Sequence, residues 1–258
     1  MHAVLCDLDG VVYQDGRLID GAAATLEWLH EHTIDCLFVT NTSSKPRQAV
    51  HAQLADMGLQ VDAETILTPA VAACHWLHER ALDNLALFVP VATREDFADF
   101  TAAEADARVV IVGDLGEDWN YRRLNHAFRL LQDNPQCSLL ALGMTRYWRS
   151  AAGLSLDTGP FVRALEFACG RTATVLGKPA TDFFKTALEK LGVTAEQALM
   201  VGDDIRGDIA GAQQAGLKAA LVQTGKFRPE DLQGETRPDA VLGSIAELPD
   251  WWERNATA

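Results

Sequence analysis

Residues 3–10 read Ala3-Val4-Leu5-Cys6-Asp7-Leu8-Asp9-Gly10, an apolar run that ends in two acidic residues and a glycine. A short apolar run bounded by polar residues is typical of a buried strand in a parallel sheet. Asp7 and Asp9 are two residues apart, so at the end of an extended strand both side chains can point to the same side. This stretch therefore predicts a sheet whose strand end carries chemistry.

The rest of the chain alternates short apolar runs with longer amphipathic ones. We expect further strands at residues 36–40, 85–90, 108–112, 138–142, 174–176, 198–201 and 218–222. We expect helices at residues 22–32, 46–57, 70–80, 121–131, 160–169, 181–191 and 208–215. Such alternation predicts βαβ units, and hence an α/β fold in which helices cover parallel sheets.

Polar residues directly follow four of these strands, and in parallel sheets ligands bind outside the carboxyl ends of the strands. The residues are Asp7 and Asp9, Thr40 and Asn41, Lys178, and the pair Asp203 and Asp204. Three strand-like runs between residues 82 and 171 end without a comparable acid cluster. We therefore expect a core domain of residues 1–81 and 172–258 and an inserted α/β cap domain of residues 82–171. Residues 228–238 read as a long loop.

The acidic residues are candidate metal ligands. Two close carboxylates repel each other unless a cation lies between them, and hard oxygen ligands suit Mg²⁺. Asp203, Asp204 and Asp208 offer further carboxylates from another strand end. A single Asp-x-Asp is more often a turn or a helix cap, and it is the combination of strand ends that favours a site.

Two other strand ends offer groups for an anion. Thr40 and Asn41 precede two more hydroxyl residues and a helix expected to start at Pro46, an arrangement suited to an anion, although taken alone it is more typical of an N-cap cluster. Lys178 supplies a cation between a glycine and Pro179. It is not part of a Walker loop, because Pro179 replaces the hydroxyl residue of that motif.

Composition excludes several classes of protein. The 36 acidic and 22 basic residues give a net charge of −14, which opposes nucleic-acid binding. No apolar run reaches the roughly 18 residues that span a bilayer, and the five scattered cysteines suggest no disulfide framework, so we expect a cytoplasmic protein. His75 and His78 lack zinc-ligand partners, and Trp251 and Trp252 suit packing or an interface.

Four motifs together resemble those of the haloacid dehalogenase superfamily, and their spacing is similar to subclass IIA, the NagD-like group. They are Asp7-Leu8-Asp9-Gly10-Val11, Val39-Thr40-Asn41, Gly177-Lys178-Pro179 and Gly202-Asp203-Asp204-Ile205-Arg206-Gly207-Asp208. The resemblance implies a Rossmann-like parallel-sheet core with a large inserted cap. It also implies a Mg²⁺-dependent phosphatase that hydrolyses a small phosphorylated metabolite, a phosphoamino acid or pyrophosphate.

The resemblance further implies a role for each motif residue. Asp7 would be the nucleophile that forms an aspartyl-phosphate, and Asp9 the general acid and base. Thr40, Asn41 and Lys178 would bind the phosphoryl oxygens. Mg²⁺ would be held by Asp7, the Asp9 carbonyl and Asp203, with Asp208, and in one alternative Asp204, behind them.

The loop from Met144 to Asp157 contains a basic and aromatic cluster, Arg146-Tyr147-Trp148-Arg149. An ordinary surface loop is an equally good interpretation. In subclass IIA the corresponding loop reaches over the phosphate site, so the resemblance implies that Trp148 and Arg149 contact the substrate.

Two alternatives stay open at this point. One is a phospho-receiver module, which the Asp-x-Asp-Gly motif and the insert oppose. The other is a catalytically silent phosphate-binding protein, which the complete residue set opposes. A small-molecule phosphate is the expected partner, with no nucleic acid and no membrane, and the resemblance is compatible with a homodimer formed through the cap.

Overall fold

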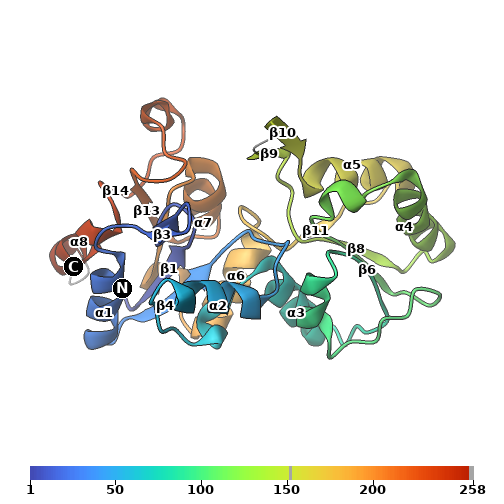
Figure 1. Ribbon diagram of the computed structural model, residues 1–258, viewed down its shortest axis with the longest axis horizontal. Coiled ribbons are helices and arrows are strands. Elements are labelled where there is room, and N and C mark those ends of the chain that lie inside the picture. Colours follow the sequence, from blue (N-terminus) through green and yellow to red (C-terminus); the bar gives the residue numbers. More distant parts are fainter. Residues whose placement is uncertain (151–152, 256–258) are drawn as a thin grey trace. The chain divides into compact units, whose positions relative to one another are not determined.

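A computed structural model describes residues 1–150 and 153–255 of the chain. The chain divides into two compact units, which are coloured along the sequence in Figure 1. The first unit comprises Met1–Thr40, Val50–Leu67 and Lys178–Ala258, and the second comprises Asn41–Ala49 and Thr68–Gly177. Each unit is described by itself below.

The first unit is built on a six-stranded parallel sheet in the order β14-β13-β12-β1-β4-β5. Its strands are β1 (Ala3–Asp7), β4 (Asp35–Val39), β5 (Ile66–Leu67), β12 (Ala198–Gly202), β13 (Lys218–Val222) and β14 (Ala240–Leu242). β1 lies in the middle, pairs with both β4 and β12, and is buried at all five residues. A buried central strand explains why the four residues before Asp7 are apolar.

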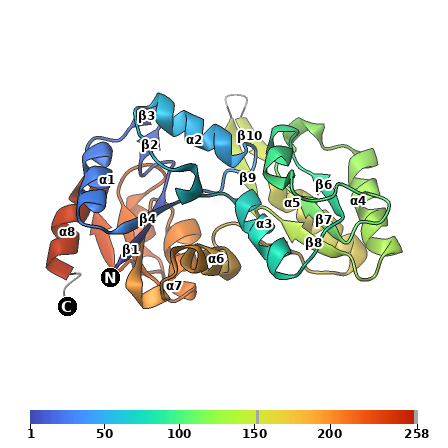
Figure 2. The same ribbon diagram turned by 90° about the horizontal axis from the view of Figure 1, so that it is seen from below.

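Helices cover this sheet, as Figure 2 shows from below. They are α1 (Ala22–Glu31), α2 (Arg47–Asp56), α6 (Thr181–Leu191), a π-helix (Ile205–Ala210), α7 (Gly211–Gln214) and α8 (Leu248–Asn255). α1 and α8 lie side by side, and Trp252 packs into the same buried cluster as Leu29 and Val4. The packing role expected for Trp252 is therefore confirmed.

Shorter elements complete the first unit. The hairpin strands β2 (Tyr13–Gln14) and β3 (Arg17–Leu18) follow β1 directly. The 3₁₀ helices are Ala63–Thr65, Ala195–Gln197, Pro229–Gln233 and Ile245–Glu247.

The second unit has a four-stranded parallel sheet in the order β11-β8-β7-β6. Its strands are β6 (Leu85–Phe88), β7 (Val109–Val112), β8 (Ser138–Ala141) and β11 (Thr174–Val175). The helices are α3 (Pro69–Glu79), α4 (Tyr121–Asp133), α5 (Thr158–Cys169) and the 3₁₀ turns Ala92–Phe97 and Gly116–Asp118. An antiparallel hairpin, β9 (Tyr147–Ser150) and β10 (Gly153–Leu156), stands between β8 and α5.

The predicted α/β class, with a parallel core sheet and an inserted second sheet, is confirmed. One strand assignment is wrong: residues 174–176 were expected in the core sheet, whereas β11 pairs with β8 of the second unit. A two-residue strand has too little pattern of its own to indicate its partner. The boundaries of the core and cap domains given above stay a prediction.

Three further segments differ from expectation. The expected loop at residues 228–238 contains the 3₁₀ helix Pro229–Gln233, and the loop Met144–Asp157 forms the hairpin β9–β10. The helix expected at 208–215 begins earlier as a π-helix before α7. In the described residues, no helix combines the length and apolar character needed to cross a bilayer.

Candidate active site

Three buried carboxylates converge at the carboxyl end of the core sheet. Asp7 ends β1, Asp203 follows β12, and Asp208 lies in the π-helix, and one carboxylate oxygen from each lies within 4.8 Å of the others. Gly202 permits this approach, because a Cβ atom there would overlap the Asp208 carboxylate. The structure thus brings together Asp7, Asp203 and Asp208 as the sequence predicted.

Lys178 supplies the buried positive charge of this cluster. Its Nζ lies 2.6 Å from Asp7 Oδ1, 2.7 Å from Asp208 Oδ1 and 3.4 Å from the Val39 carbonyl oxygen. Burial by itself lowers the pKa of Lys178, but the charges of Asp208 and Asp7 outweigh it and raise that pKa. Lys178 therefore stays protonated and fixes the Asp7 side chain beside Asp208.

Asp208 also organises the backbone next to it. Its Oδ2 accepts hydrogen bonds from the backbone N–H groups of Asp203 and Asp204, both at 3.1 Å. Burial, opposed by the charge of Lys178, raises the pKa of Asp208 to about 6. Both of its oxygens are thus engaged by the protein, which makes Asp208 a residue that positions Lys178 and the turn carrying Asp203.

Asp204 caps the π-helix. Its Oδ1 accepts hydrogen bonds from the backbone N–H groups of Arg206 and Gly207, both at 2.9 Å. Although burial raises the pKa of Asp204, these hydrogen bonds and the charge of Lys226 lower it overall. Its charge is therefore stabilised by the helix start and by a lysine.

Asp203 has an oxygen that a metal ion could use. Its Oδ2 accepts a hydrogen bond of 2.6 Å from the Lys226 backbone N–H, while its buried Oδ1 has no hydrogen-bond partner among the described residues. Burial and then the negative charge of Asp7 raise the pKa of Asp203 to about 7. A buried, unsatisfied carboxylate oxygen beside a second carboxylate is the donor set of a hard divalent cation, so these residues fit Mg²⁺.

The remaining motif residues lie at the same sheet edge or in the second unit. Asp9 is exposed, two residues beyond the buried Asp7, and its backbone bridges to Tyr13. Thr40 follows β4, is buried, and donates its backbone N–H to the Leu67 carbonyl oxygen. Asn41 is the first residue of the second unit.

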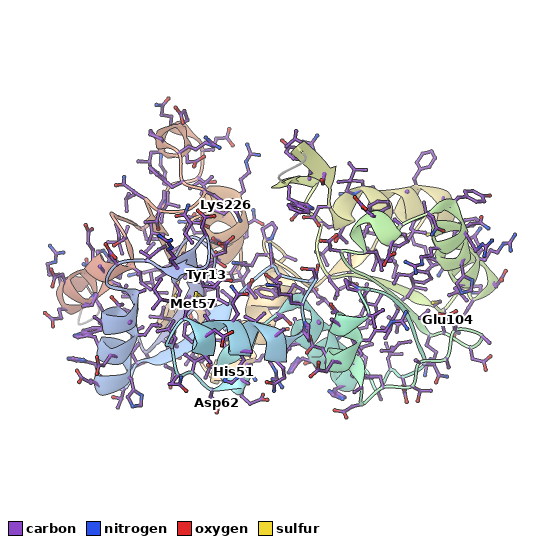
Figure 3. All side chains as sticks on the ribbon, viewed as in Figure 1. Tyr13, His51, Met57, Asp62, Glu104 and Lys226 are labelled. Atoms are coloured by element: carbon purple, nitrogen blue, oxygen red, sulfur yellow. The ribbon has the colours of Figure 1, made fainter. Side chains whose placement is uncertain are left out.

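A loop after β13 completes the site, and none of the four motifs includes it. The Thr224 hydroxyl donates to the Gly10 carbonyl oxygen, and Lys226 follows two residues later, labelled in Figure 3. The Lys226 Nζ lies 3.8 Å from Asp204 Oδ2, and its side chain is 64% exposed. The signal that could have found this lysine is a Thr-Gly-Lys run just beyond the end of a predicted strand.

The predicted cap residues lie on the hairpin of the second unit. Trp148 is 48% exposed on β9, opposite Ser155 of β10. The side chain of Arg149 lies outside the described part of the structure. No substrate contact for either residue follows from the fold of this unit alone.

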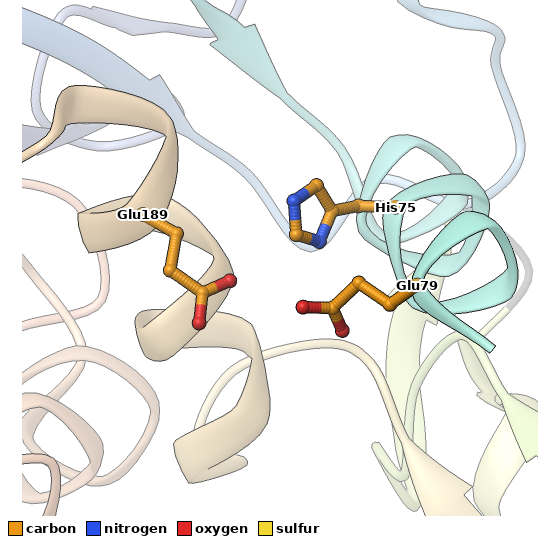
Figure 4. A group of neighbouring side chains, drawn as sticks. All are labelled: His75, Glu79 and Glu189. Carbon is orange, nitrogen blue, oxygen red and sulfur yellow. The ribbon is translucent and has the colours of Figure 1, made fainter.

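His75 and His78, for which the sequence indicated no zinc site, lie on α3. The ring of His78 stacks on Phe100 with centroids 4.8 Å apart, which supports its structural role. Figure 4 shows His75 and Glu79, one helical turn apart on α3, together with Glu189 of α6. Because Glu189 belongs to the first unit and the other two to the second, we assign no site to this group.

The parallel core sheet, the acid cluster and the inserted second sheet define a phosphohydrolase of the haloacid dehalogenase type. A model of the family described as haloacid dehalogenase-like hydrolase matches residues 4–116, and a second model of such hydrolases matches residues 175–248. The chain belongs to this family, in its NagD-like subclass IIA.

The relatives are similar along nearly the whole chain. Phospholysine phosphohistidine inorganic pyrophosphate phosphatase of Homo sapiens is 38% identical over 97% of this chain and 93% of its own length. The crystal structure of 4-nitrophenylphosphatase from Thermotoga maritima has a TM-score of 0.89 at 29% identity, covering 97% of both chains. NagD from E. coli K-12 has a TM-score of 0.86 at 26% identity, over 96% of this chain and 98% of its own. The chain is a phosphatase of the haloacid dehalogenase family.

Proposed function

We propose that this phosphatase uses Mg²⁺ and an aspartyl-phosphate intermediate to hydrolyse a small phosphorylated metabolite, a phosphoamino acid or pyrophosphate. The observation that carries the proposal is the buried Oδ1 of Asp203, which has no hydrogen-bond partner among the described residues and lies near Asp7, whose own Oδ1 is 2.6 Å from Lys178 Nζ. A carboxylate that a lysine holds in place can be aimed at a phosphoryl group, as a nucleophile must be.

The first step forms a bond between an Asp7 carboxylate oxygen and phosphorus, while the bond from phosphorus to the leaving oxygen breaks. Asp9, exposed two residues away, gives its proton to the leaving oxygen. In the second step Asp9 takes a proton from water, whose oxygen attacks phosphorus and releases phosphate from Asp7. Because Asp7 is buried and Asp9 is exposed, the proposal assigns bond formation to Asp7 and proton transfer to Asp9.

Charge develops on the phosphoryl oxygens in both steps. Mg²⁺, when bound by Asp7, the Asp9 carbonyl and Asp203, would supply positive charge to these oxygens. Lys178, Thr40 and Asn41 would donate hydrogen bonds to them. Asp208 would act through Lys178 and the Asp203 turn, to which both of its oxygens are bonded.

Other parts of the chain take supporting roles in the proposal. Residues 1–81 and 172–258 would serve as the catalytic domain and residues 82–171 as a cap, with Trp148 and Arg149 contacting the leaving group. The cytoplasmic location and a homodimer formed through the cap stay predictions. Neither a receiver module nor a silent phosphate-binding protein would turn over substrate, so hydrolysis separates both alternatives from the proposal.

The test is a phosphatase screen in Mg²⁺ with pyrophosphate, phosphoamino acids, nucleotides and sugar phosphates. The Asp7→Asn variant is the matched control, since the amide is nearly isosteric with the carboxylate but is a poor nucleophile. We expect the wild type to release phosphate from at least one of these substrates, and a folded Asp7→Asn variant to release none. Turnover by that variant at the wild-type rate would remove Asp7 from the mechanism.

A further inference from the structure

We propose that Lys226 is a specificity-determining residue that binds a negatively charged leaving group, so that the site favours phosphates whose leaving group is itself an anion. The inference rests on the proposed phosphatase function and deepens it. It assigns a task to a lysine that lies outside the four sequence motifs.

The backbone of Lys226 is fixed to both acidic turns of the site. Its N–H donates to Asp203 Oδ2 at 2.6 Å, and the Thr224 hydroxyl, two residues earlier, donates to the Gly10 carbonyl oxygen. Between them Gly225 adopts φ +62°, and a Cβ atom there would overlap both Asp203 and Gly10. The Cα atom of Lys226 is therefore held at the site, whatever its side chain does.

The two lysines of the site differ in what their ammonium groups can reach. Lys178 is 5% exposed, and its Nζ already contacts Asp7, Asp208 and the Val39 carbonyl oxygen. Lys226 is 64% exposed at its side chain. A leaving group that departs toward solvent can therefore meet the ammonium of Lys226, whereas that of Lys178 is enclosed by the protein.

The ion pair between Lys226 and Asp204 is weak, so Lys226 can exchange it for a contact with the substrate. Its Nζ lies 3.8 Å from Asp204 Oδ2, and the two side chains are 64% and 35% exposed. Exposed ion pairs of this kind stabilise a protein little. The other carboxylate oxygen of Asp204, Oδ1, accepts hydrogen bonds from two backbone N–H groups. The charge of Asp204 therefore stays stabilised when Lys226 contacts a substrate instead.

The negative charge of the protein explains why a lysine at this place matters for an anionic leaving group. A net charge of −14 and a cluster of carboxylates repel an anionic substrate from the site. A neutral leaving group adds nothing to that repulsion, but a carboxylate or phosphate leaving group does. An exposed lysine beside the acidic turns offsets the repulsion selectively for such substrates.

The experiment compares two substrates that differ in one charged group. Phosphoglycolate and 2-hydroxyethyl phosphate have leaving groups of similar size, and only the first carries a carboxylate. We would measure kcat/KM for both at low ionic strength and fixed free Mg²⁺, using wild type, Lys226→Met and Lys226→Arg. Lys218→Met is the matched control, because Lys218 is an exposed lysine at the opposite end of β13.

We expect Lys226→Met to lower the ratio of kcat/KM for phosphoglycolate to that for 2-hydroxyethyl phosphate by about 10-fold, equivalent to about 1.4 kcal/mol. Lys226→Arg should keep most of the ratio, and Lys218→Met all of it. Added salt should raise the ratio in Lys226→Met more than in wild type, because salt screens the repulsion that Lys226 otherwise offsets.

Two outcomes would overturn the inference while leaving the phosphatase function standing. One is an unchanged ratio in Lys226→Met, and the other is an equal loss on both substrates, which would make Lys226 a structural residue of the Asp203 turn. Thermal melting of each variant identifies a folding defect. If Lys226→Met has such a defect, the test rests on Lys226→Arg, which keeps the charge, and on its ratio of kcat/KM for the two substrates. No turnover by wild type with any phosphate would instead overturn the function itself.

Discussion

Gly10 and the carboxylate of Asp203 are in such close contact that no side chain fits at residue 10. Its backbone has φ +89°, and a Cβ atom would overlap Asp203 Oδ2. The turn after β1 therefore packs directly against the turn after β12, with no side chain of residue 10 between them. This contact fixes how near Asp7 and Asp203 come to each other.

A methyl group at Gly10 should therefore damage the site more than the fold. Gly10→Ala should lower kcat/KM at least 100-fold and weaken Mg²⁺ binding, because Asp203 must move. Gly16→Ala is the matched control, since Gly16 also has positive φ, +74°, but no atom of the described residues lies within 4 Å of the place that its new methyl group would take. That control should cost about 1 kcal/mol of stability and leave activity near wild type. Similar kinetics for the two variants would mean that the contact with Asp203 is unimportant.

Asp9→Asn should separate the general acid from the nucleophile. Loss of a positioned acid and base should lower the rate by roughly 10²–10⁴. A 4-nitrophenyl leaving group needs no proton, so its first step should suffer less than that of an alkyl phosphate. Single-turnover measurements with both substrates check this, and Asp20→Asn, another exposed aspartate of the same unit, serves as control. Equal losses for the two substrates would argue against the role of Asp9.

Mg²⁺ should stabilise the folded protein as well as activate it. Binding to the native state alone contributes about 2.7 kcal/mol at a concentration 100 times Kd, which raises Tm by roughly 5–10 °C in a chain of this size. The increase should vanish in Asp203→Asn and in excess chelator, and chelator should also abolish activity. Differential scanning calorimetry with and without Mg²⁺ measures the shift. A wild-type increase that persists in Asp203→Asn would place the ion elsewhere.

Trp148→Ala should change which substrates are preferred. If the hairpin β9–β10 contacts the leaving group, the ranking of kcat/KM among substrates should shift by about 10-fold, while a small aryl phosphate stays nearly unaffected. Phe167→Ala is the control, because Phe167 is an aromatic residue of the same unit that is 93% exposed on α5. If Trp148→Ala and Phe167→Ala gave the same ranking of substrates by kcat/KM, the hairpin would be an ordinary surface element.

Much of the fold could be predicted because its strands are buried and continuous. β13, for example, was expected at residues 218–222 and occupies Lys218–Val222, since its four residues after Lys218 are buried and apolar. The short strands β5 and β14, with two and three residues, have no such pattern. The hairpin β9–β10 resembles a loop in sequence because its strands have four residues each and contain no continuous apolar run.

The site was partly predictable for a similar reason. Asp7 and Asp203 lie at the ends of recognisable runs, and the topology of the parallel core sheet brings these ends together, whereas Lys178 follows β11, a strand of the second unit. The contact between Lys178 and Asp7 joins residues 171 positions apart, so only the motif pattern could indicate it. Lys226 was not predicted as a site residue because a hydrogen bond from its backbone N–H holds it at the site. Every residue except proline has such a group, so this hydrogen bond has no signal in the sequence.

The points where the chain passes between the two units have a consequence for protein engineering. The chain leaves the first unit after Thr40 and after Leu67, and it returns at Val50 and at Lys178; Thr40 and Lys178 belong to the proposed phosphate site. A chimera that exchanges the second unit for that of a relative would therefore have two of its four splice junctions one peptide bond from residues of that proposed site. Junctions moved outward, into β4 and α6, would carry both residues over with the donor segment and keep each beside its native neighbours.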